Sequence, residues 1–213
     1  GGVRRAALIS LSDLEDEGIR YAKHGRWWEN APHRALANNS AVYTSKPPTG
    51  TYMREMLSLY DSQSGERGVF NREAAEKKMR EIGRDVNYDI GVNPCAEILL
   101  RSKQFCNLSE VVLRRGDSAE DVYHKVAIAT VLGTLQSAVT DFDYLSEEWK
   151  KNTEEERLLG VSLTGVMDWW HDGSVGVLQK ARRLAVETNA WAALGLGTPA
   201  STAITCVKPS GTL

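Results

Sequence analysis

Three side chains that could do chemistry together fall within five positions near the middle of this chain. Asn93, Cys95 and Glu97 supply an amide, a thiol and a carboxylate, each two residues from the next. Because side chains two residues apart point to the same side of an extended segment, we expect all three to face one pocket. A neighbouring carboxylate disfavours a thiolate, so the spacing suits a neutral S–H group and radical chemistry. An isolated Cys-x-Glu pair is more often a buried cysteine beside an unrelated surface glutamate, so the rest of the sequence has to decide.

The chain has two other cysteines, Cys106 and Cys206. Cys106 follows Cys95 by eleven positions, and the absence of a Cys-x-x-Cys pair disfavours an oxidoreductase that uses these two as its own redox couple. Cys206 stands in an apolar, strand-like run, where a cysteine usually acts as a small buried hydrophobe, so we expect it to be inert. The four histidines lack the spacing of a zinc site, and we expect no metal bound directly by this segment.

The composition excludes several classes of protein. With a net charge of -2, 42% hydrophobic and 25% charged residues, the chain is close to an average globular protein. A protein that wraps nucleic acid would be strongly basic. No apolar run reaches the roughly 18 residues of a membrane-spanning helix, and the first residues lack the apolar core of a signal peptide. We therefore expect a cytoplasmic protein with neither a nucleic-acid nor a membrane partner.

Strands and helices alternate along the chain, which predicts an α/β architecture with crossover connections. Strands are expected at residues 7–11, 41–43, 108–114, 159–163 and 202–207, and helices at 13–21, 52–60, 72–82, 119–139, 146–157 and 177–194. Between them, residues 89–100 are interrupted by Gly91 and Pro94 and are expected to form a loop between two strands. Such loops are the usual place for chemistry.

The clearest helix boundary is the Ser118-x-x-Asp121 capping box. Apolar residues follow it at helical spacing, and we expect this stripe to be buried core. Its members are Val122, Ile128, Val131, Leu132, Leu135 and Val139. Ser12 and Asp13 offer a similar N-cap for the first helix.

Four motifs, in the same order, resemble segments of the ribonucleotide reductases. Residues 93–97, Asn-Pro-Cys-Ala-Glu, followed by Cys-Asn-Leu at 106–108, resemble the active-site finger loop of that family. Residues 204–212, Ile-Thr-Cys-Val-Lys-Pro-Ser-Gly-Thr, resemble its substrate-phosphate loop. Residues 1–7 are similar to the loop between the effector site and the substrate base, and residues 160–165 to a core segment. The resemblance runs across essentially the whole chain.

Within the family, the short separation of Cys95 and Cys106 resembles the adenosylcobalamin-dependent class II enzymes, since the diiron class has a longer one. Residues 64–71 and 106–112 look more like the monomeric triphosphate reductases than the dimeric diphosphate reductases, which stay the alternative. The resemblance implies a ten-stranded α/β barrel of two half-barrels around a central finger loop. Residues 1–213 are then expected to be an internal fragment of this barrel domain, truncated at both ends and inactive alone.

The resemblance also implies a role for each matched residue. Cys95 would become the thiyl radical that abstracts the 3′-hydrogen of the ribose, Glu97 would accept the proton of the 3′-hydroxyl, and Asn93 would hold the sugar. Cys106 would be one half of the dithiol that reduces the 2′-position, with its partner outside this chain. The substrate phosphates would be bound at the start of a helix by Pro209, Ser210, Gly211 and Thr212. The effector loop would consist of Gly1, Gly2, Val3, Arg4 and Arg5.

These roles imply a ribonucleoside triphosphate as substrate, a deoxynucleoside triphosphate as effector and a thioredoxin-like reductant. Adenosylcobalamin would generate the radical, and its site cannot be located in this chain. A protein of another class, a catalytically silent nucleotide-binding module, could use the same two loops. The intact Asn93, Cys95 and Glu97 set speaks against that alternative, because binding alone needs no thiol there.

Overall fold

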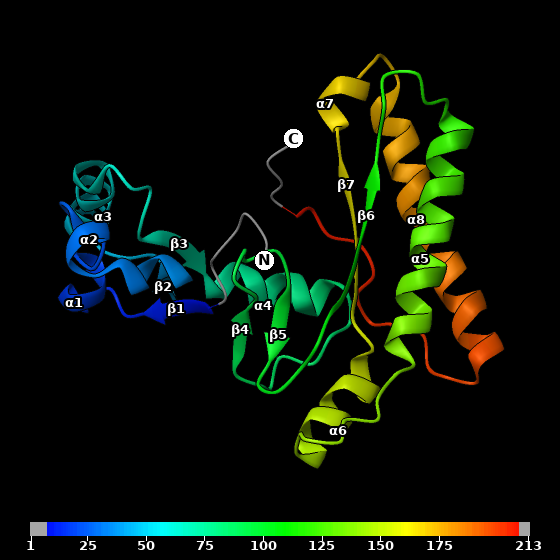
Figure 1. The fold of residues 1–213 in the computed structure, drawn as a ribbon, viewed down its shortest axis with the longest axis horizontal. Coiled ribbons are helices and arrows are strands. Elements are labelled where there is room, and N and C mark those ends of the chain that lie inside the picture. The colour runs from blue at the N-terminus through cyan, green and yellow to red at the C-terminus, as the bar shows by residue number, and fades with distance from the viewer. Residues whose placement is uncertain (1–7, 209–213) are drawn as a thin grey trace. The chain divides into compact units, whose positions relative to one another are not determined.

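The computed structural model describes residues 8–208, and the chain divides after Leu99 into two units (Figure 1). Each unit contains parallel β-strands that are connected through helices. This arrangement confirms the α/β architecture predicted from the alternation of strands and helices.

Three parallel strands in the order β1-β2-β3 form the sheet of the first unit. The elements in chain order are β1 (Leu8–Ser12), α1 (Glu17–Arg20), α2 (Trp27–Asn30), a 3-10 helix (Pro32–Leu36), β2 (Ala37–Tyr43), α3 (Thr49–Ser62), β3 (Gly68–Asn71), α4 (Arg72–Glu81) and β4 (Ile90–Val92). Strand β4 pairs with β5 (Leu99–Arg101), which begins at the boundary between the units. Val42, Phe70, Ala75 and Val92 make a small apolar core.

The first helix starts later than the sequence predicts. Its N-cap is Asp16, whose Oδ1 accepts a hydrogen bond from Ile19 N at 3.0 Å, and not Ser12 or Asp13. Those two residues instead accept hydrogen bonds from Arg67. Its Nη1 donates to Ser12 Oγ at 2.9 Å and to Asp13 O at 2.7 Å. Contact with a residue that is more than fifty positions away in the sequence therefore delays the start of α1.

Elsewhere in the first unit the longer elements were predicted, but the short α2, the 3-10 helix, β3 and β4 were not. The helices predicted at 52–60 and 72–82 are confirmed as α3 and α4. Strand β2 begins at Ala37 rather than at residue 41, because the polar run from Asn38 to Ser40 pairs with Ile9 to Leu11 of β1.

Glu55 of α3 is buried between two arginines. Its Oε1 accepts from Arg20 Nε at 2.6 Å and from Arg67 Nη2 at 2.9 Å, and its Oε2 accepts from Arg67 Nε at 3.0 Å. Burial alone would raise the pKa of Glu55, but the hydrogen bonds and charges of Arg67 and Arg20 outweigh it and hold this pKa below its ordinary value. Burial also raises the pKa of nearby Tyr43, and the Glu55 carboxylate adds to that rise. The ion cluster joins α1, α3 and the segment before β3.

The lowered pKa of Glu55 predicts a stability loss in acid. The contribution of the ionised carboxylate is complete above the unfolded pKa of about 4.3 and is lost as the pH falls through the lower folded pKa. Glu55→Gln leaves two buried arginines without their counter-charge and should cost about 3–5 kcal/mol near neutral pH. As the pH is lowered below about 4, the free energy of unfolding of Glu55→Gln should also decrease less than that of the parent protein. Urea unfolding at a series of pH values measures both, and parallel pH curves for the two proteins would contradict the assignment.

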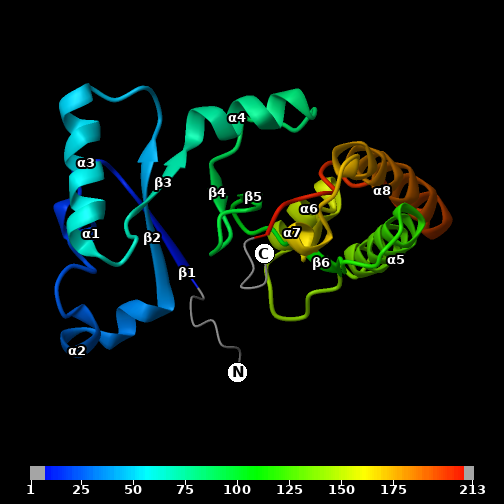
Figure 2. The same ribbon diagram turned by 90° about the horizontal axis from the view of Figure 1, so that it is seen from above.

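In the second unit, β6 (Asn107–Val112) and β7 (Leu159–Thr164) run parallel, with Asn107 beside Leu159 and Val112 beside Thr164. The strand predicted at 202–207 is reduced to a single parallel bridge between Thr205 and Val161. The helices are α5 (Ala119–Ser137), α6 (Glu147–Glu156), α7 (Val166–Trp169) and α8 (Ser174–Leu196). Helix α5 packs on both strands and on α8, so the two long helices lie on the same side of the strands (Figures 1 and 2).

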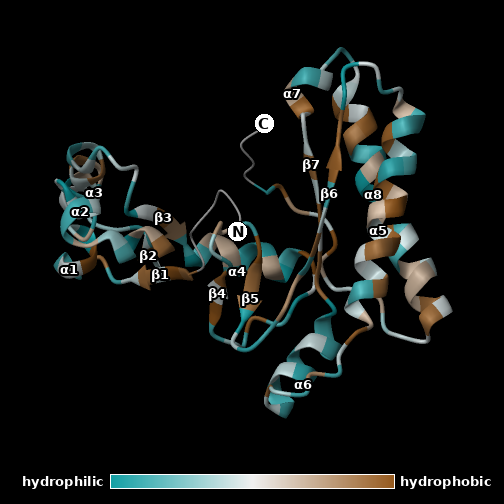
Figure 3. Ribbon diagram, in the orientation of Figure 1, coloured by the Kyte–Doolittle hydropathy of each residue, from teal (hydrophilic) through white to brown (hydrophobic). Residues whose placement is uncertain are grey.

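The apolar stripe predicted to be the buried face of α5 is mostly exposed. The capping box is confirmed, since Ser118 Oγ accepts from Asp121 N at 3.2 Å and Asp121 Oδ2 accepts from Ser118 N at 2.9 Å. Val122 is fully buried, but Ile128, Leu132, Leu135 and Val139 are 62%, 58%, 47% and 66% exposed. Apolar segments recur along α5 and α8 in Figure 3. The prediction for α5 was therefore wrong for most of the stripe.

Small and hydroxyl-bearing residues form the buried face of α5 instead. They are Val122, Val126, Ala129, Thr130, Gly133, Thr134 and Ser137. Gly133 allows a close approach to β7, because a Cβ atom there would lie 3.2 Å from Leu159 Cδ2. The hydroxyls of Thr130 and Thr134 donate to Val126 O and Thr130 O, and buried Asn189 of α8 donates to Thr134 Oγ1 at 2.9 Å. These polar groups are satisfied, so their burial costs little.

The packing of α5 predicts a large effect at one position and almost none at another, three residues further along the helix. Gly133→Val forces the new side chain into Leu159 and should destabilise the protein by about 1–3 kcal/mol. Gln136→Ala, on the exposed side of the same helix, should change the free energy of unfolding by less than about 0.5 kcal/mol. Urea unfolding of both variants tests this. A stabilising Gly133→Val, as expected for an exposed helical glycine, would show that the face is misassigned.

Candidate functional site

Residues 93–98 form the loop between β4 and β5, which is shorter than the loop predicted at 89–100 because Ile90–Val92 and Leu99–Arg101 are strands. Asn93 holds both ends of this loop together. Its N–H donates to Ile98 O at 3.3 Å, and its side-chain Oδ1 accepts from Ile98 N at 3.1 Å. The amide of Asn93 is thus used within the loop itself.

The loop is a tight turn and not the extended segment that the sequence predicted. Ala96 N donates to Asn93 O at 2.8 Å, which closes a turn with Pro94 and Cys95 at its centre. Ala96 has φ of 63°, a left-handed conformation that is uncommon outside glycine. The alternation of side chains in an extended strand therefore does not apply to Asn93, Cys95 and Glu97.

Glu97 has a buried carboxylate to which none of the described residues donates a hydrogen bond. Both of its oxygens are shielded from solvent, and neither accepts a hydrogen bond from any residue between 8 and 208. Buried carboxylate oxygens normally have a partner, because desolvation without one costs free energy. Glu97 can therefore accept a hydrogen bond or a proton from a hydroxyl group that a bound molecule brings.

Cys95 stands at the turn, two residues before Glu97, and is half-buried. A thiol in this position is shielded from bulk water and yet accessible to a molecule bound at the loop. The loop thus supplies a thiol that can donate a hydrogen atom and a carboxylate that can accept a proton.

Two side chains that the sequence analysis did not select hold this loop. Asn38 of β2 donates from its Nδ2 to Pro94 O. Buried Arg84 donates from Nη1 to Leu99 O at 3.0 Å. The polar Asn38-Asn39-Ser40 run was a signal for the first, since a polar run inside a strand needs partners. Nothing in the sequence around Arg84 distinguishes it from a surface arginine.

The other two cysteines lie in the second unit and are half-buried. Cys106 directly precedes β6, between Phe105 and Asn107. Cys206 lies in the segment beside β7, where its N–H donates to Val161 O at 3.1 Å. Cys206 therefore lies beside a strand and not in one, and it is half-buried where the sequence predicts a buried residue.

Two sets of predicted site residues lie outside the described range. These are Gly1, Gly2, Val3, Arg4 and Arg5 at one end and Pro209, Ser210, Gly211 and Thr212 at the other. Lys208 is the last described residue before the second set, and its N–H donates to Ser162 Oγ of β7 at 3.0 Å. The entry to residues 209–212 is thus attached to a buried strand.

Among residues 8–208, no three His, Cys, Asp or Glu side chains are grouped so that they could hold a metal ion. No helix in this part of the chain is both long enough and apolar enough to cross a membrane.

The chain is similar in sequence to adenosylcobalamin-dependent ribonucleoside-triphosphate reductases. It is 30% identical over 176 residues to the protein of that name from Levilactobacillus brevis and 27% identical over 188 residues to that from Lacticaseibacillus paracasei. These matches cover 79% and 80% of this chain but only 22% of each relative. The chain thus spans less than a quarter of the length of the curated relatives that it matches. No family model matches the chain.

The fold is similar to that of solved ribonucleotide reductases. A B-12 dependent class II ribonucleotide reductase superimposes with a TM-score of 0.73 and 22% identity, over 96% of this chain and 32% of that one. The alpha subunit of the Actinobacillus ureae class Id ribonucleotide reductase gives a TM-score of 0.57 at 15% identity, over 94% and 45% of the two chains. The resemblance inferred from four short motifs is confirmed by both comparisons.

Proposed function

We propose that this chain is the part of an adenosylcobalamin-dependent ribonucleoside-triphosphate reductase that carries the radical thiol. The observation that carries the proposal is the buried Glu97 carboxylate, which has no donor among residues 8–208 and stands two residues from Cys95 in a turn closed by hydrogen bonds. The similarity to reductases of that name over 79% of the chain supports it. Because the chain spans 22% of those relatives, the activity is proposed for the whole protein.

We further propose that residues 1–213 are an internal part of a ten-stranded α/β barrel, with the 93–98 loop as its central finger. The fold similarity and the all-parallel pairing of β1-β2-β3 and of β6-β7 support this architecture. Parallel strands need partners and covering helices on both sides, which the rest of the polypeptide would supply.

In the proposed mechanism, Cys95 and Glu97 act on the same sugar. The Cys95 thiyl radical takes the 3′-hydrogen atom of the ribose and becomes a thiol, while Glu97 accepts the proton of the 3′-hydroxyl group. The buried carboxylate gains from that hydroxyl the donor that no residue between 8 and 208 supplies. Asn93 keeps the loop closed through its two hydrogen bonds to Ile98, so it would position the pair by holding the turn as well as by binding the sugar.

Cys106 would supply half of the reducing equivalents. Cys106 and a second thiol elsewhere in the polypeptide give two electrons and two hydrogens to the 2′-position. One hydrogen replaces the hydroxyl group on carbon, the other leaves with that hydroxyl as water, and the two sulfur atoms form a disulfide. Cys95 then returns its hydrogen to the 3′-carbon, and a thioredoxin-like dithiol reduces the disulfide by exchange.

The cofactor and the remaining ligands follow from the same proposal. Adenosylcobalamin, when bound, would supply the radical that removes the hydrogen atom from the Cys95 thiol. The half-buried Cys95 fits that role, since its sulfur is shielded from bulk water but not enclosed. We also propose that residues 209–212 bind the substrate phosphates and that residues 1–5 respond to a deoxynucleoside triphosphate effector.

Substitutions at Cys95 and at Glu97 test the proposed hydrogen-atom abstraction and the proposed proton transfer, respectively. Cys95→Ala in the full-length protein should leave nucleotide binding within about 0.5 kcal/mol of the parent and remove turnover, because the hydrogen abstractor is lost. Glu97→Gln keeps the shape of the side chain but loses the base, so product formation should drop by about 10²–10⁴. Conversion of CTP to its deoxy form, with CDP as the comparison substrate, measures both. A turnover rate of Cys95→Ala within about ten-fold of the parent rate would contradict the assignment of the thiyl radical to Cys95.

Cys106 and Cys206 should differ in their effect on activity. Cys106→Ser should abolish multiple turnovers with a dithiol reductant, since no disulfide can form. Cys206→Ser should cost about 1 kcal/mol of stability for its half-buried hydroxyl and leave activity near that of the parent. If the two variants behaved the other way round, the redox thiol would be Cys206.

A further inference from the structure

Gln104, two residues before Cys106, is buried and uses both ends of its amide. Its Oε1 accepts a hydrogen bond from Arg101 N at 2.9 Å. Its Nε2 donates to Asn152 O at 3.0 Å and to Glu156 Oε2 at 2.7 Å. Because Asn152 and Glu156 belong to α6, Gln104 attaches the segment before Cys106 to that helix.

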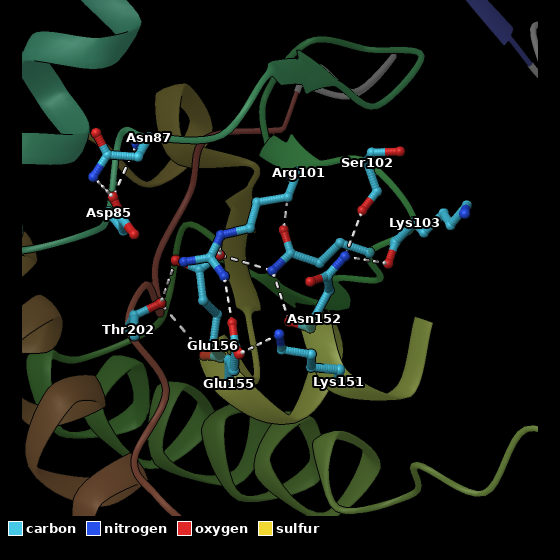
Figure 4. Close-up of polar contacts among 11 residues, drawn as sticks. Asp85, Asn87, Arg101, Ser102, Lys103, Lys151, Asn152, Glu155, Glu156 and Thr202 are labelled. Carbon is cyan, nitrogen blue, oxygen red and sulfur yellow. Dashed lines mark hydrogen bonds and ion pairs between the residues drawn. The ribbon is translucent and has the colours of Figure 1, made fainter. Parts of the chain in front are cut away.

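Further contacts attach residues 101–103 to the same helix (Figure 4). Asn152 Nδ2 donates to Ser102 O at 2.8 Å, and Arg101 Nη1 lies 2.8 Å from Glu155 Oε2. Lys103 has φ of 52°, a left-handed conformation that a non-glycine residue keeps only where its surroundings compensate. The backbone before Cys106 is therefore held in one specific turn.

The residues on either side of Cys106 are held as well. The Phe105 ring stacks on Trp149 of α6 with centroids 4.7 Å apart, and it meets Phe142 edge-on at 5.1 Å. Asn107 donates to Leu158 O twice, from its backbone N at 2.9 Å and from Nδ2 at 3.1 Å. Leu158 follows α6 by two residues, so α6 and its C-terminal end fix both flanks of the cysteine.

We propose that Gln104, through its contacts with Asn152 and Glu156 of α6, is the positioning residue that sets the place of the Cys106 thiol. The inference rests on the role proposed above for Cys106. A disulfide requires sulfur atoms about 2.05 Å apart and Cα atoms within about 4.4–6.8 Å, so a redox cysteine needs a backbone held within narrow limits. Buried Gln104 restrains this backbone, because its amide forms hydrogen bonds with Arg101 N and with Asn152 O and Glu156 Oε2 of α6.

Glu156 contacts both Gln104 and the segment that leads to the proposed phosphate loop. Its backbone O accepts a hydrogen bond from Thr202 N at 3.0 Å, while its Oε2 accepts from Gln104. Thr202 begins the segment that runs beside β7 toward residues 209–212. The C-terminal turn of α6 therefore supports both the redox cysteine and the approach to the proposed phosphate loop.

The test compares two thiols in the same full-length molecule. Gln104→Met keeps the length of the side chain and removes its hydrogen bonds, and Gln136→Met on the exposed side of α5 is the matched control. The rate of alkylation by iodoacetamide is followed by peptide mass spectrometry for Cys106 and for Cys206 as the internal reference. Formation of deoxycytidine triphosphate by the prereduced protein, without added dithiol, is measured in parallel.

Gln104→Met should change the ratio of Cys106 to Cys206 alkylation by about five-fold or more, because local opening of the segment becomes easier. Single-turnover product formation should fall by about ten- to a hundred-fold with KM unchanged, as expected for a misplaced reacting group. Gln136→Met should leave both readouts within about two-fold. An alkylation ratio within about two-fold of the parent in a folded Gln104→Met protein overturns the proposal.

Gln104→Asn tests the same contacts with an amide that is one methylene group shorter, in case Gln104→Met does not fold. It should shift the alkylation ratio in the same direction, and an unchanged ratio in this variant also overturns the proposal. The parent protein is assayed for deoxynucleotide formation as well. If the parent makes none but the alkylation ratio shifts in the variant, the attachment of Cys106 to α6 is supported and the proposed reductase function is overturned.

Discussion

The burial of the Glu97 carboxylate without a hydrogen-bond donor in the described part of the chain is the constraint on which the proposed chemistry depends. Leaving a buried polar group unsatisfied costs about 1–3 kcal/mol, and more when the group is charged. The loop would relieve that cost by turning the carboxylate toward solvent if it were free to move. It is held instead by the paired bonds between Asn93 and Ile98 and by the bond from Asn38 to Pro94. A fixed acceptor without a partner among residues 8–208, two residues from a thiol in the sequence, is what a site for a hydroxyl-bearing substrate requires.

Three glutamates whose carboxylates are buried show how surroundings separate structural from chemical roles. Glu55 is satisfied by Arg20 and Arg67, and its lowered pKa marks it as a permanent anion within an ion cluster. Glu156 accepts from Gln104 and supports the two segments beside α6. Glu97 has neither kind of partner among the described residues. The residue type is the same in each case, and only the donors around it differ, so the unsatisfied carboxylate is the one available to a ligand.

Local signals in the sequence predicted much of the fold and less of its packing. The Ser118 capping box gave the start of α5, because a cap depends on residues three positions apart. The exposed stripe of α5 and the late start of α1 could not be predicted, since the first depends on the close approach at Gly133 and the second on the distant Arg67. In the candidate site, the sequence pointed to Cys95 and Glu97 as residue types. It could not show the turn, which depends on backbone hydrogen bonds and on the left-handed Ala96, or the contacts of Gln104 with α6.

The central claim is that Cys95 carries the unpaired electron during turnover. Electron paramagnetic resonance tests it most directly, on full-length protein frozen during reaction with adenosylcobalamin, CTP, an effector and a reductant. Cysteine deuterated at Cβ should alter the line shape of the radical signal, since the electron resides on a cysteine sulfur, and Cys95→Ser should remove the signal while Cys106→Ser keeps it. A signal that is insensitive to deuterated cysteine, or that persists in Cys95→Ser, would contradict the account.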